Sequence, residues 1–157
     1  MNIFRAIEIL NKNQSVDLCK KASGRIICSN YVNDKIINKY KPFNIWSPYR
    51  ASEETYKYLL DNFPDLKYEV CKALIMARYN DLYFKHNFEA ELELFRTAAK
   101  TANKEVYDDQ LKKAKKLGKF YVYFDMENEQ ILNEPKFVSF EDGFMEMKFD
   151  YESMFCN

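Results

Sequence analysis

Glycine, histidine and long apolar runs are scarce in this sequence of 157 residues, and each shortage excludes a class of protein. The three glycines, at positions 24, 118 and 143, are too few and too far apart to form a G-x-G-x-x-G or P-loop phosphate site. A single histidine, His86, excludes zinc sites built from several imidazoles. The H-E-x-x-H and G-x-S-x-G motifs are absent as well. We therefore predict no catalytic residue, no cofactor and no metal ion.

The longest apolar runs, such as residues 73–77, are far shorter than the roughly 18 residues that a membrane helix needs. The four cysteines form no C-x-x-C pair, and the first residues lack the apolar core of a signal peptide. We expect reduced thiols in a cytoplasmic protein. The abundance of Lys, Asn, Ile, Tyr and Phe suggests an AT-rich genome, and we expect a bacterial host and a phage origin.

With 47% hydrophobic residues, residues 1–157 are predicted to form a single domain. Apolar residues at helical spacing predict a helix over residues 2–12. They also predict a helix from Ser52 to near Pro64, a central helix over 65–85, and one or two helices over 87–117. Residues 24–28 resemble a short strand, and residues 33–50 a structured loop anchored by Trp46.

After Gly118 the apolar period changes to two, which is typical of strands. Residues 120–124, 136–140 and 144–151 read as three antiparallel strands, with a tight turn at Glu141-Asp142-Gly143. The predicted fold class is therefore α+β, with four to five helices packed on a C-terminal antiparallel sheet and possibly a short N-terminal strand.

Charge is unevenly distributed although 24 basic residues balance 24 acidic ones. Residues 1–50 hold nine Lys or Arg and three Asp or Glu, whereas residues 121–157 hold two and nine. Such asymmetry either steers a charged partner or is neutralised where the two ends meet. We predict that the acidic end binds a partner through Tyr121, Tyr123, Asp125, Glu127, Glu129, Glu141, Asp142, Glu146, Asp150 and Glu152. An ordinary solvated face of an edge strand would show the same pattern.

The leading hypothesis is a small phage protein that inhibits a host nucleic-acid enzyme, in the manner of an anti-CRISPR protein, by occupying its basic groove. Its partner would be a host nucleic-acid-binding protein or nuclease, with no membrane partner. An alternative is direct nucleic-acid binding through the basic, aromatic N-terminal third. That third combines Arg5, Lys12, Lys20, Lys21, Arg25, Lys35, Lys39, Lys41 and Arg50 with Tyr31, Tyr40, Phe43, Trp46 and Tyr49.

Three further features have both a chemical and a structural interpretation. Asp125, Glu127 and Glu129 could hold Mg²⁺ in a nuclease, but a solvated turn has the same composition. The lysines of residues 112–119 could contact phosphates, but acids first and bases last is also what a helix dipole favours. His86 stands where a helix end is expected, a position that favours a cation.

Overall fold

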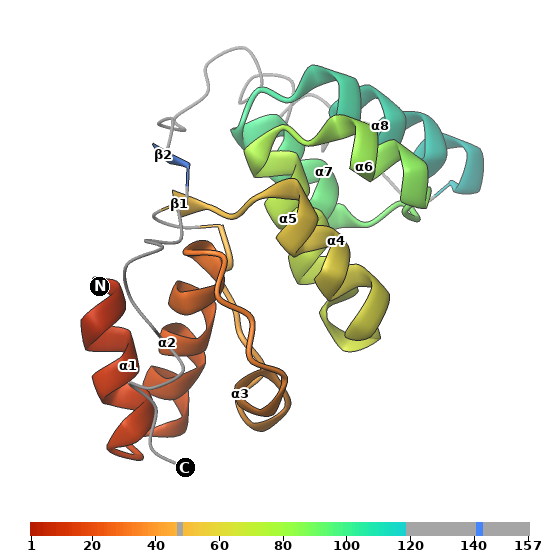
Figure 1. The fold of residues 1–157 in the computed structure, drawn as a ribbon. Helices are drawn as coiled ribbons and strands as arrows, with labels where there is room; N and C mark the ends of the chain where they lie inside the picture. The colour runs from red at the N-terminus through yellow and green to blue at the C-terminus, as the bar shows by residue number, and fades with distance from the viewer. Residues whose placement is uncertain (47–48, 119–140, 143–157) are drawn as a thin grey trace. The chain divides into compact units, whose positions relative to one another are not determined.

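The computed structural model describes residues 1–46, 49–118 and 141–142, and this part of the chain is mostly helical (Figure 1). Its α-helices are α1 (Ile3–Asn11), α2 (Val16–Cys28), α3 (Asp34–Lys39), α4 (Glu53–Asn62), α5 (Lys67–Ala77), α6 (Asn80–His86), α7 (Leu92–Lys100) and α8 (Lys104–Leu117). The remaining elements are the 3-10 helix η1 (Pro64–Leu66) and the strands β1 (Tyr49–Arg50) and β2 (Glu141–Asp142).

The prediction of an α+β fold is wrong. The described residues contain eight α-helices, and their only β structure is a pair of two-residue strands, β1 and β2, which run parallel. Glu141 and Asp142 were expected in a tight antiparallel turn, yet they are extended and pair with Tyr49 and Arg50. The predicted strands over 120–124, 136–140 and 144–151 lie outside the described residues. Alternation of apolar residues indicates a half-buried strand only if a partner strand is available, and sequence alone does not identify that partner.

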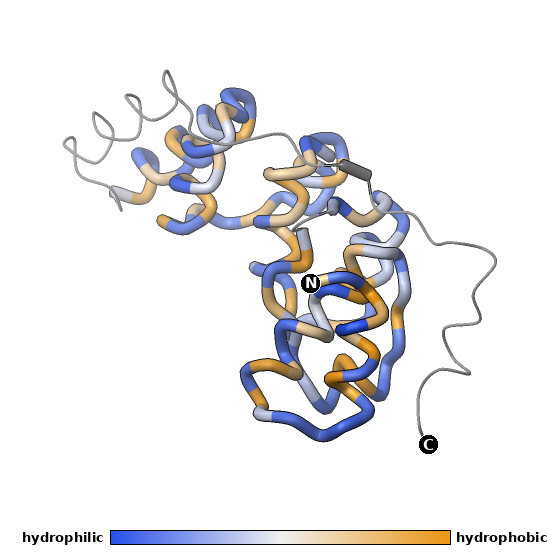
Figure 2. Tube along the Cα trace, turned by 90° about the vertical axis from the view of Figure 1, so that its left-hand side faces the viewer, coloured by the Kyte–Doolittle hydropathy of each residue, from blue (hydrophilic) through white to orange (hydrophobic). Residues whose placement is uncertain are grey.

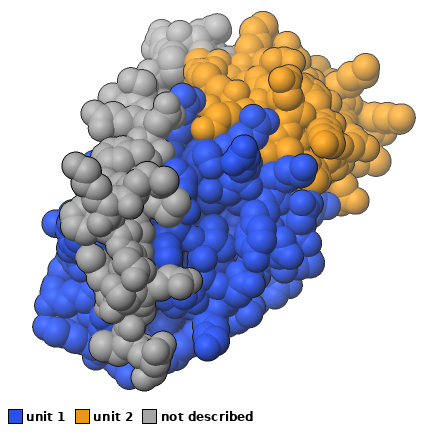
Figure 3. All heavy atoms as spheres, viewed as in Figure 1, with its two compact units in different colours: residues 1–69, 140–157 blue, residues 70–139 orange. Residues whose placement is uncertain are grey.

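The chain forms two compact units, one of residues 1–69 with 140–157 and the other of residues 70–139 (Figure 3). We call them unit 1 and unit 2 and describe each by itself. The prediction of a single domain stays a prediction. Along the helices of both units, hydropathy changes repeatedly between apolar and polar, as amphipathic helices require (Figure 2).

Unit 1 begins with the helical hairpin of α1 and α2, and side-chain caps define where its helices start. Asn2 accepts a hydrogen bond from the Arg5 amide at 2.8 Å, and Ser15 accepts one from the Leu18 amide at 3.4 Å. The predicted helix over residues 2–12 is confirmed as α1, whose buried stripe packs on α2. Each such cap stabilises a helix by about 1 kcal/mol.

The strand predicted over residues 24–28 is wrong, because these residues form the second half of α2. Cys19, Ala22 and Ile26 recur at helical spacing and are buried against α1. Gly24 is not a strand boundary: a Cβ atom there would overlap the carbonyl oxygen of Phe43. Glycine therefore allows the loop after α3 to lie directly on α2.

Residues 33–50 are only partly a loop, since they contain α3, which is capped by the side chain of Asn33. Ile45 is fully buried, whereas Trp46 is half-buried. The hydroxyl of Tyr56 donates to the Ile45 carbonyl at 2.7 Å and accepts from the Ala51 amide at 3.0 Å. The predicted anchor at Trp46 is therefore displaced by one residue, to Ile45.

The helix predicted from Ser52 to near Pro64 is confirmed as α4, with Ser52 as its N-cap. The single helix predicted over 65–85 is wrong, because α5 and α6 are separated at Arg78, whose φ is 62°. The helices over 87–117 are two, α7 and α8, separated at Ala102 with φ 53°. Gly118 ends α8 as predicted. Asn87, expected to start a helix, instead ends α6 in the left-handed conformation.

Helix ends without glycine explain why the break at Arg78 was missed and the break at Ala102 was left open. At Asn30, Arg78 and Ala102 the backbone has positive φ. At each, paired amide-to-carbonyl hydrogen bonds close the helix, for example Tyr79 to Leu74 at 3.0 Å and Asn103 to Ala98 at 2.9 Å. This is the Schellman arrangement, which usually uses glycine. A chain with three glycines must form it with residues that tolerate the left-handed region less well.

Candidate functional site

A groove in unit 1 has two walls. One wall is formed by α3 and Lys41, and the other by the corner where α4 meets η1. The groove encloses about 260 Å³. Its lining residues are Ile37, Asn38, Lys41, Asn62, Phe63, Pro64, Asp65 and Leu66. Ile37 and Leu66 are almost fully buried and form an apolar floor, whereas the amides and charges stand at the rim.

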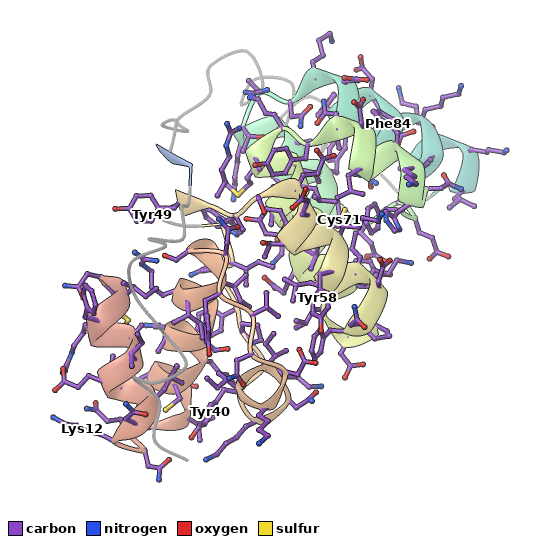
Figure 4. The ribbon with its side chains drawn as sticks, viewed as in Figure 1. Lys12, Tyr40, Tyr49, Tyr58, Cys71 and Phe84 are labelled. Carbon is purple, nitrogen blue, oxygen red and sulfur yellow. The ribbon has the colours of Figure 1, made fainter. Side chains whose placement is uncertain are left out.

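The two walls of the groove are joined by side-chain contacts at both ends. At one end the Tyr58 hydroxyl lies 3.1 and 3.2 Å from the two carboxylate oxygens of Asp34 (Figure 4 labels Tyr58). At the other end the ammonium of Lys41 lies 3.0 Å from a carboxylate oxygen of Asp65. Hydrogen bonding to the Asp34 carboxylate raises the pKa of Tyr58 above its usual value, so the phenol stays protonated and donates.

The residue pairs that face each other across the groove are separated by the same number of residues in the sequence. Asp34 and Tyr58 are 24 residues apart, and so are Lys41 and Asp65. Between these bridges, at the same offset, Asn38 and Asn62 both line the groove. Asp34 and Asn38 lie one turn apart on α3, and Tyr58 and Asn62 lie one turn apart on α4, so each pair shares a face of its helix. The middle pair thus consists of two side-chain amides, whereas the outer pairs are joined by a hydrogen bond and by an ion pair.

The side chains of the middle pair, Asn38 and Asn62, still have donors and acceptors available for a ligand. Asn62 donates its side-chain amide to the Tyr58 carbonyl at 2.9 Å. In the described part of the chain, the side chain of Asn38 forms no hydrogen bond, and it is exposed. A primary amide offers two donors and an acceptor, so the rim can pair with another polypeptide backbone. The sequence reading singled out neither residue, because it placed no helix at 34–39.

Only two of the ten residues of the predicted partner-binding surface lie among the described residues. Glu141 and Asp142 form β2, whose backbone pairs with β1 in the basic N-terminal part of the chain. The other eight residues of the predicted surface lie outside the described residues: Tyr121, Tyr123, Asp125, Glu127, Glu129, Glu146, Asp150 and Glu152. The Mg²⁺ site considered at Asp125, Glu127 and Glu129 lies there too. In residues 1–46, 49–118 and 141–142, no group of three His, Cys, Asp or Glu side chains could hold a metal ion.

Several basic residues of the N-terminal third have structural partners. Arg25 is buried, donates to the Met1 carbonyl at 2.8 Å and to the Ser29 hydroxyl at 2.6 Å, and lies over the Tyr49 ring. Lys12 and Arg5 share the carboxylate of Glu8, and these two cations lower the pKa of Glu8 to about 2. The predicted basic surface is therefore smaller than its nine residues suggest.

Of the lysines in residues 112–119, Lys113 is held within unit 2. Its ammonium lies 2.7 Å from the Phe88 carbonyl and 3.0 Å from the Asp109 carboxylate. Lys119 lies outside the described residues. His86 ends α6 as expected, and its Nε2 is buried with no hydrogen-bond partner among the described residues.

A buried polar network centred on Gln110 fixes the loop before α7 to α8. The amide of Gln110 donates to the Tyr83 hydroxyl at 2.7 Å and to the Glu89 carbonyl at 3.2 Å, and its oxygen accepts from the Glu91 amide at 3.0 Å. Tyr83 in turn donates to Asp109 at 2.7 Å. Burial, with a further contribution from Asp109, raises the pKa of Tyr83. Every polar group of this network is satisfied within the protein, so its role is structural.

No helix in the described ranges is long and apolar enough to cross a membrane. No solved structure matches the chain. Two proteins of the yeast Kluyveromyces lactis are similar to it. One, described as uncharacterized killer plasmid pGKl-2 protein 1, is 43% identical over 136 residues, which cover 86% of this chain and 61% of that protein. The other, described as RF4 protein, is 28% identical over 133 residues, covering 84% of this chain and 30% of that protein.

These relatives correct the predicted origin. The relative that is 43% identical is described as a killer plasmid protein of a yeast, and not as a phage protein. The hypothesis of an anti-CRISPR-like inhibitor and the expectation of a bacterial host are therefore wrong. The amino-acid composition suggested an AT-rich genome, but such a composition does not identify a phage. The chain spans less than two thirds of the length of either relative. Residues 46–155 match the family described as the YKP1 C-terminal domain, and the chain belongs to that family.

Proposed function

We propose that this chain is a protein-docking module of a yeast plasmid protein, and that the groove between α3 and the α4–η1 corner binds an extended segment of a partner protein. The observation that carries the proposal is the middle pair of the groove, in which Asn38 and Asn62 stand over an apolar floor. An extended peptide presents alternating amide donors and acceptors that pair with asparagine side chains.

The size and charge of the groove define what it would accept. A volume of about 260 Å³ lies just below the roughly 300–1,000 Å³ of pockets for small-molecule ligands. It suits one large side chain of a peptide better than a whole cofactor. Lys41 and Asp65 neutralise each other at the rim, so an uncharged, apolar side chain fits best. Burying a Leu or Phe side chain there would contribute about 1.5–3 kcal/mol to binding.

The groove joins two parts of the chain that differ in family coverage. Ile37, Asn38 and Lys41 precede the matched range that begins at residue 46, whereas Asn62 to Leu66 lie within it. Binding at this groove would therefore require both parts. The earlier prediction of a host nucleic-acid-binding protein or nuclease as partner stays a prediction, as does partner binding by the ten acidic and aromatic residues.

Selection from a library of displayed random peptides tests the proposal directly. We expect enriched peptides to share one large apolar residue, and their binding to be lost in Asn62→Trp, whose indole fills the groove. Lys57→Trp is the matched control, since Lys57 is exposed on α4 and does not line the groove. Peptides that bind both variants equally, or a library that yields no enriched sequence, would refute groove binding.

A further inference from the structure

We propose a second interaction surface on unit 1, a basic edge that binds single-stranded nucleic acid, formed by Lys20, Lys35, Lys39 and Tyr40. The edge is separate from the groove, and its function does not depend on the proposed docking of a protein. It uses fewer residues than the whole basic N-terminal third, because the structure shows which cations are already held by other parts of the protein.

The edge lies where the turn between α1 and α2 meets the end of α3. Asn13 occupies this turn with φ 49°, and the Tyr40 hydroxyl lies 3.4 Å from its side-chain oxygen. Tyr40 also packs against the core formed by α1 and α2. Lys12 precedes Asn13 directly, and Figure 4 shows Lys12 and Tyr40 at the same end of unit 1. The ring of Tyr40 is thus held in place and remains partly exposed.

Two lysines of α3 flank this ring. The ammonium of Lys39 lies 5.1 Å from the centroid of the Tyr40 ring. Lys35 is four residues earlier, so it lies on the same face of α3, about 6 Å further along the axis. Neither lysine takes part in an ion pair with a described residue, and both are exposed. A cation next to an aromatic face is the combination that single-stranded nucleic acid uses, through phosphate contact and base stacking.

Lys20 extends the edge along α2. Tyr40 contacts Asn13 before α2, and Phe43 contacts Gly24 within it, so residues 40–43 run along this helix. Lys20 lies one turn before Gly24 on the same helix face, and thus beside this segment. It is half-buried and takes part in no ion pair with a described residue.

Few acids oppose these charges. Residues 1–41 hold eight Lys or Arg and three acids, Glu8, Asp17 and Asp34. Glu8 is bound to Arg5 and Lys12, and Asp34 accepts from Tyr58. Asp17 lies in the first turn of α2, where the helix dipole favours an acid. Residues 1–41 therefore carry an excess of positive charge, as a surface that binds phosphates requires.

Fluorescence anisotropy with labelled oligo(U) and oligo(dT) tests the edge across salt concentrations from about 50 to 200 mM. We expect binding that weakens with salt. The Lys35→Glu, Lys39→Glu double variant should lower the affinity and make the slope of log affinity against log salt shallower by about 1.4, since each single-strand phosphate contact contributes about 0.7. Tyr40→Leu should weaken binding by about 5-fold or more, as loss of stacking on one base predicts, and Tyr40→Phe should not.

The control variant is Lys57→Glu with Lys85→Glu, which changes the net charge equally but leaves the edge intact. Lys57 lies on α4 between Glu53 and Asp61, one turn away on either side, so its charge is already offset. If this control weakens binding as much as the double variant on α3, the effect is one of net charge and the edge is refuted. Absence of binding at the lowest salt, or equal binding of duplex DNA, would also overturn the proposal.

Discussion

Substitution of Asn30 separates two contributions to the stability of unit 1. Asn30 has φ 64°, and its side-chain oxygen accepts from the Ser52 amide at 2.6 Å and from the Thr55 hydroxyl at 2.9 Å. One residue thus closes the end of α2 and holds the start of α4. A left-handed conformation costs a residue with a Cβ about 1–2 kcal/mol, and a partly buried amide left unpaired costs about 1–3 kcal/mol.

Three variants are expected to differ in a fixed order. Asn30→Gly keeps the backbone conformation and loses the acceptor, so the free energy of unfolding should fall by about 1–3 kcal/mol. Asn30→Ala loses both the acceptor and the tolerance of positive φ, so its free energy of unfolding should fall by about 1 kcal/mol more than that of Asn30→Gly. Asn30→Asp keeps the acceptor and tolerates positive φ, so it should stay within about 1 kcal/mol of the wild type at neutral pH.

Urea unfolding followed by far-UV circular dichroism measures these differences, because helix dominates the described residues. Equal stability of the Gly and Ala variants would show that the backbone at residue 30 is not strained. An Asp variant as unstable as the Ala variant would show that the contacts to Ser52 and Thr55 do not stabilise the fold. Either result would refute the corresponding half of the reasoning.

Three other predictions concern the cores of the two units. Gly24→Ala should destabilise the protein by about 1–3 kcal/mol in urea unfolding, because the added Cβ meets the Phe43 carbonyl. Helix propensity alone favours alanine, so a more stable variant would contradict this contact. Gln110→Ala should lower stability by about 2–4 kcal/mol, since the Glu91 amide and the Glu89 carbonyl lose their partner; a loss below about 1 kcal/mol would contradict the network. Burial raises the pKa of Tyr83, so its contribution to stability is complete below the unfolded pKa near 10 and is lost as pH rises above it. Tyr83→Phe should therefore lose less thermal stability than the wild type as the pH rises above about 10. The same dependence of the unfolding temperature on pH in both proteins would contradict this prediction.

Local signals in the sequence predicted some helix boundaries correctly. Ser52 with two following acids marks the start of α4, and Gly118 after four lysines marks the end of α8. Both signals satisfy backbone groups within a few residues, so neither depends on the rest of the fold. Helix ends at Arg78 and Ala102 were not predictable in this way, because neither residue type favours positive φ.

Long-range contacts account for the remaining errors. The pattern in residues 24–28 fits a strand until Gly24 is seen to face Phe43, which is 19 residues away. The groove was missed because the register shared by residues 34–41 and 58–65 becomes visible only when the two segments are adjacent. The pairing of Glu141 with Tyr49 is more distant still, and nothing in the local sequence of either strand identifies its partner.

The division of the chain into units has a practical consequence for dissecting the protein. Unit 1 is assembled from both ends of the chain, so unit 2 interrupts it. A fragment that starts at residue 46, where the family match begins, would remove the carbonyl of Ile45 that Tyr56 needs and the oxygen of Asn30 that holds Ser52. Tyr56 and Leu59, which are fully buried in the whole chain, would lose part of their covering. Such a fragment is expected to aggregate, and the boundary of sequence similarity is therefore a poor place to cut.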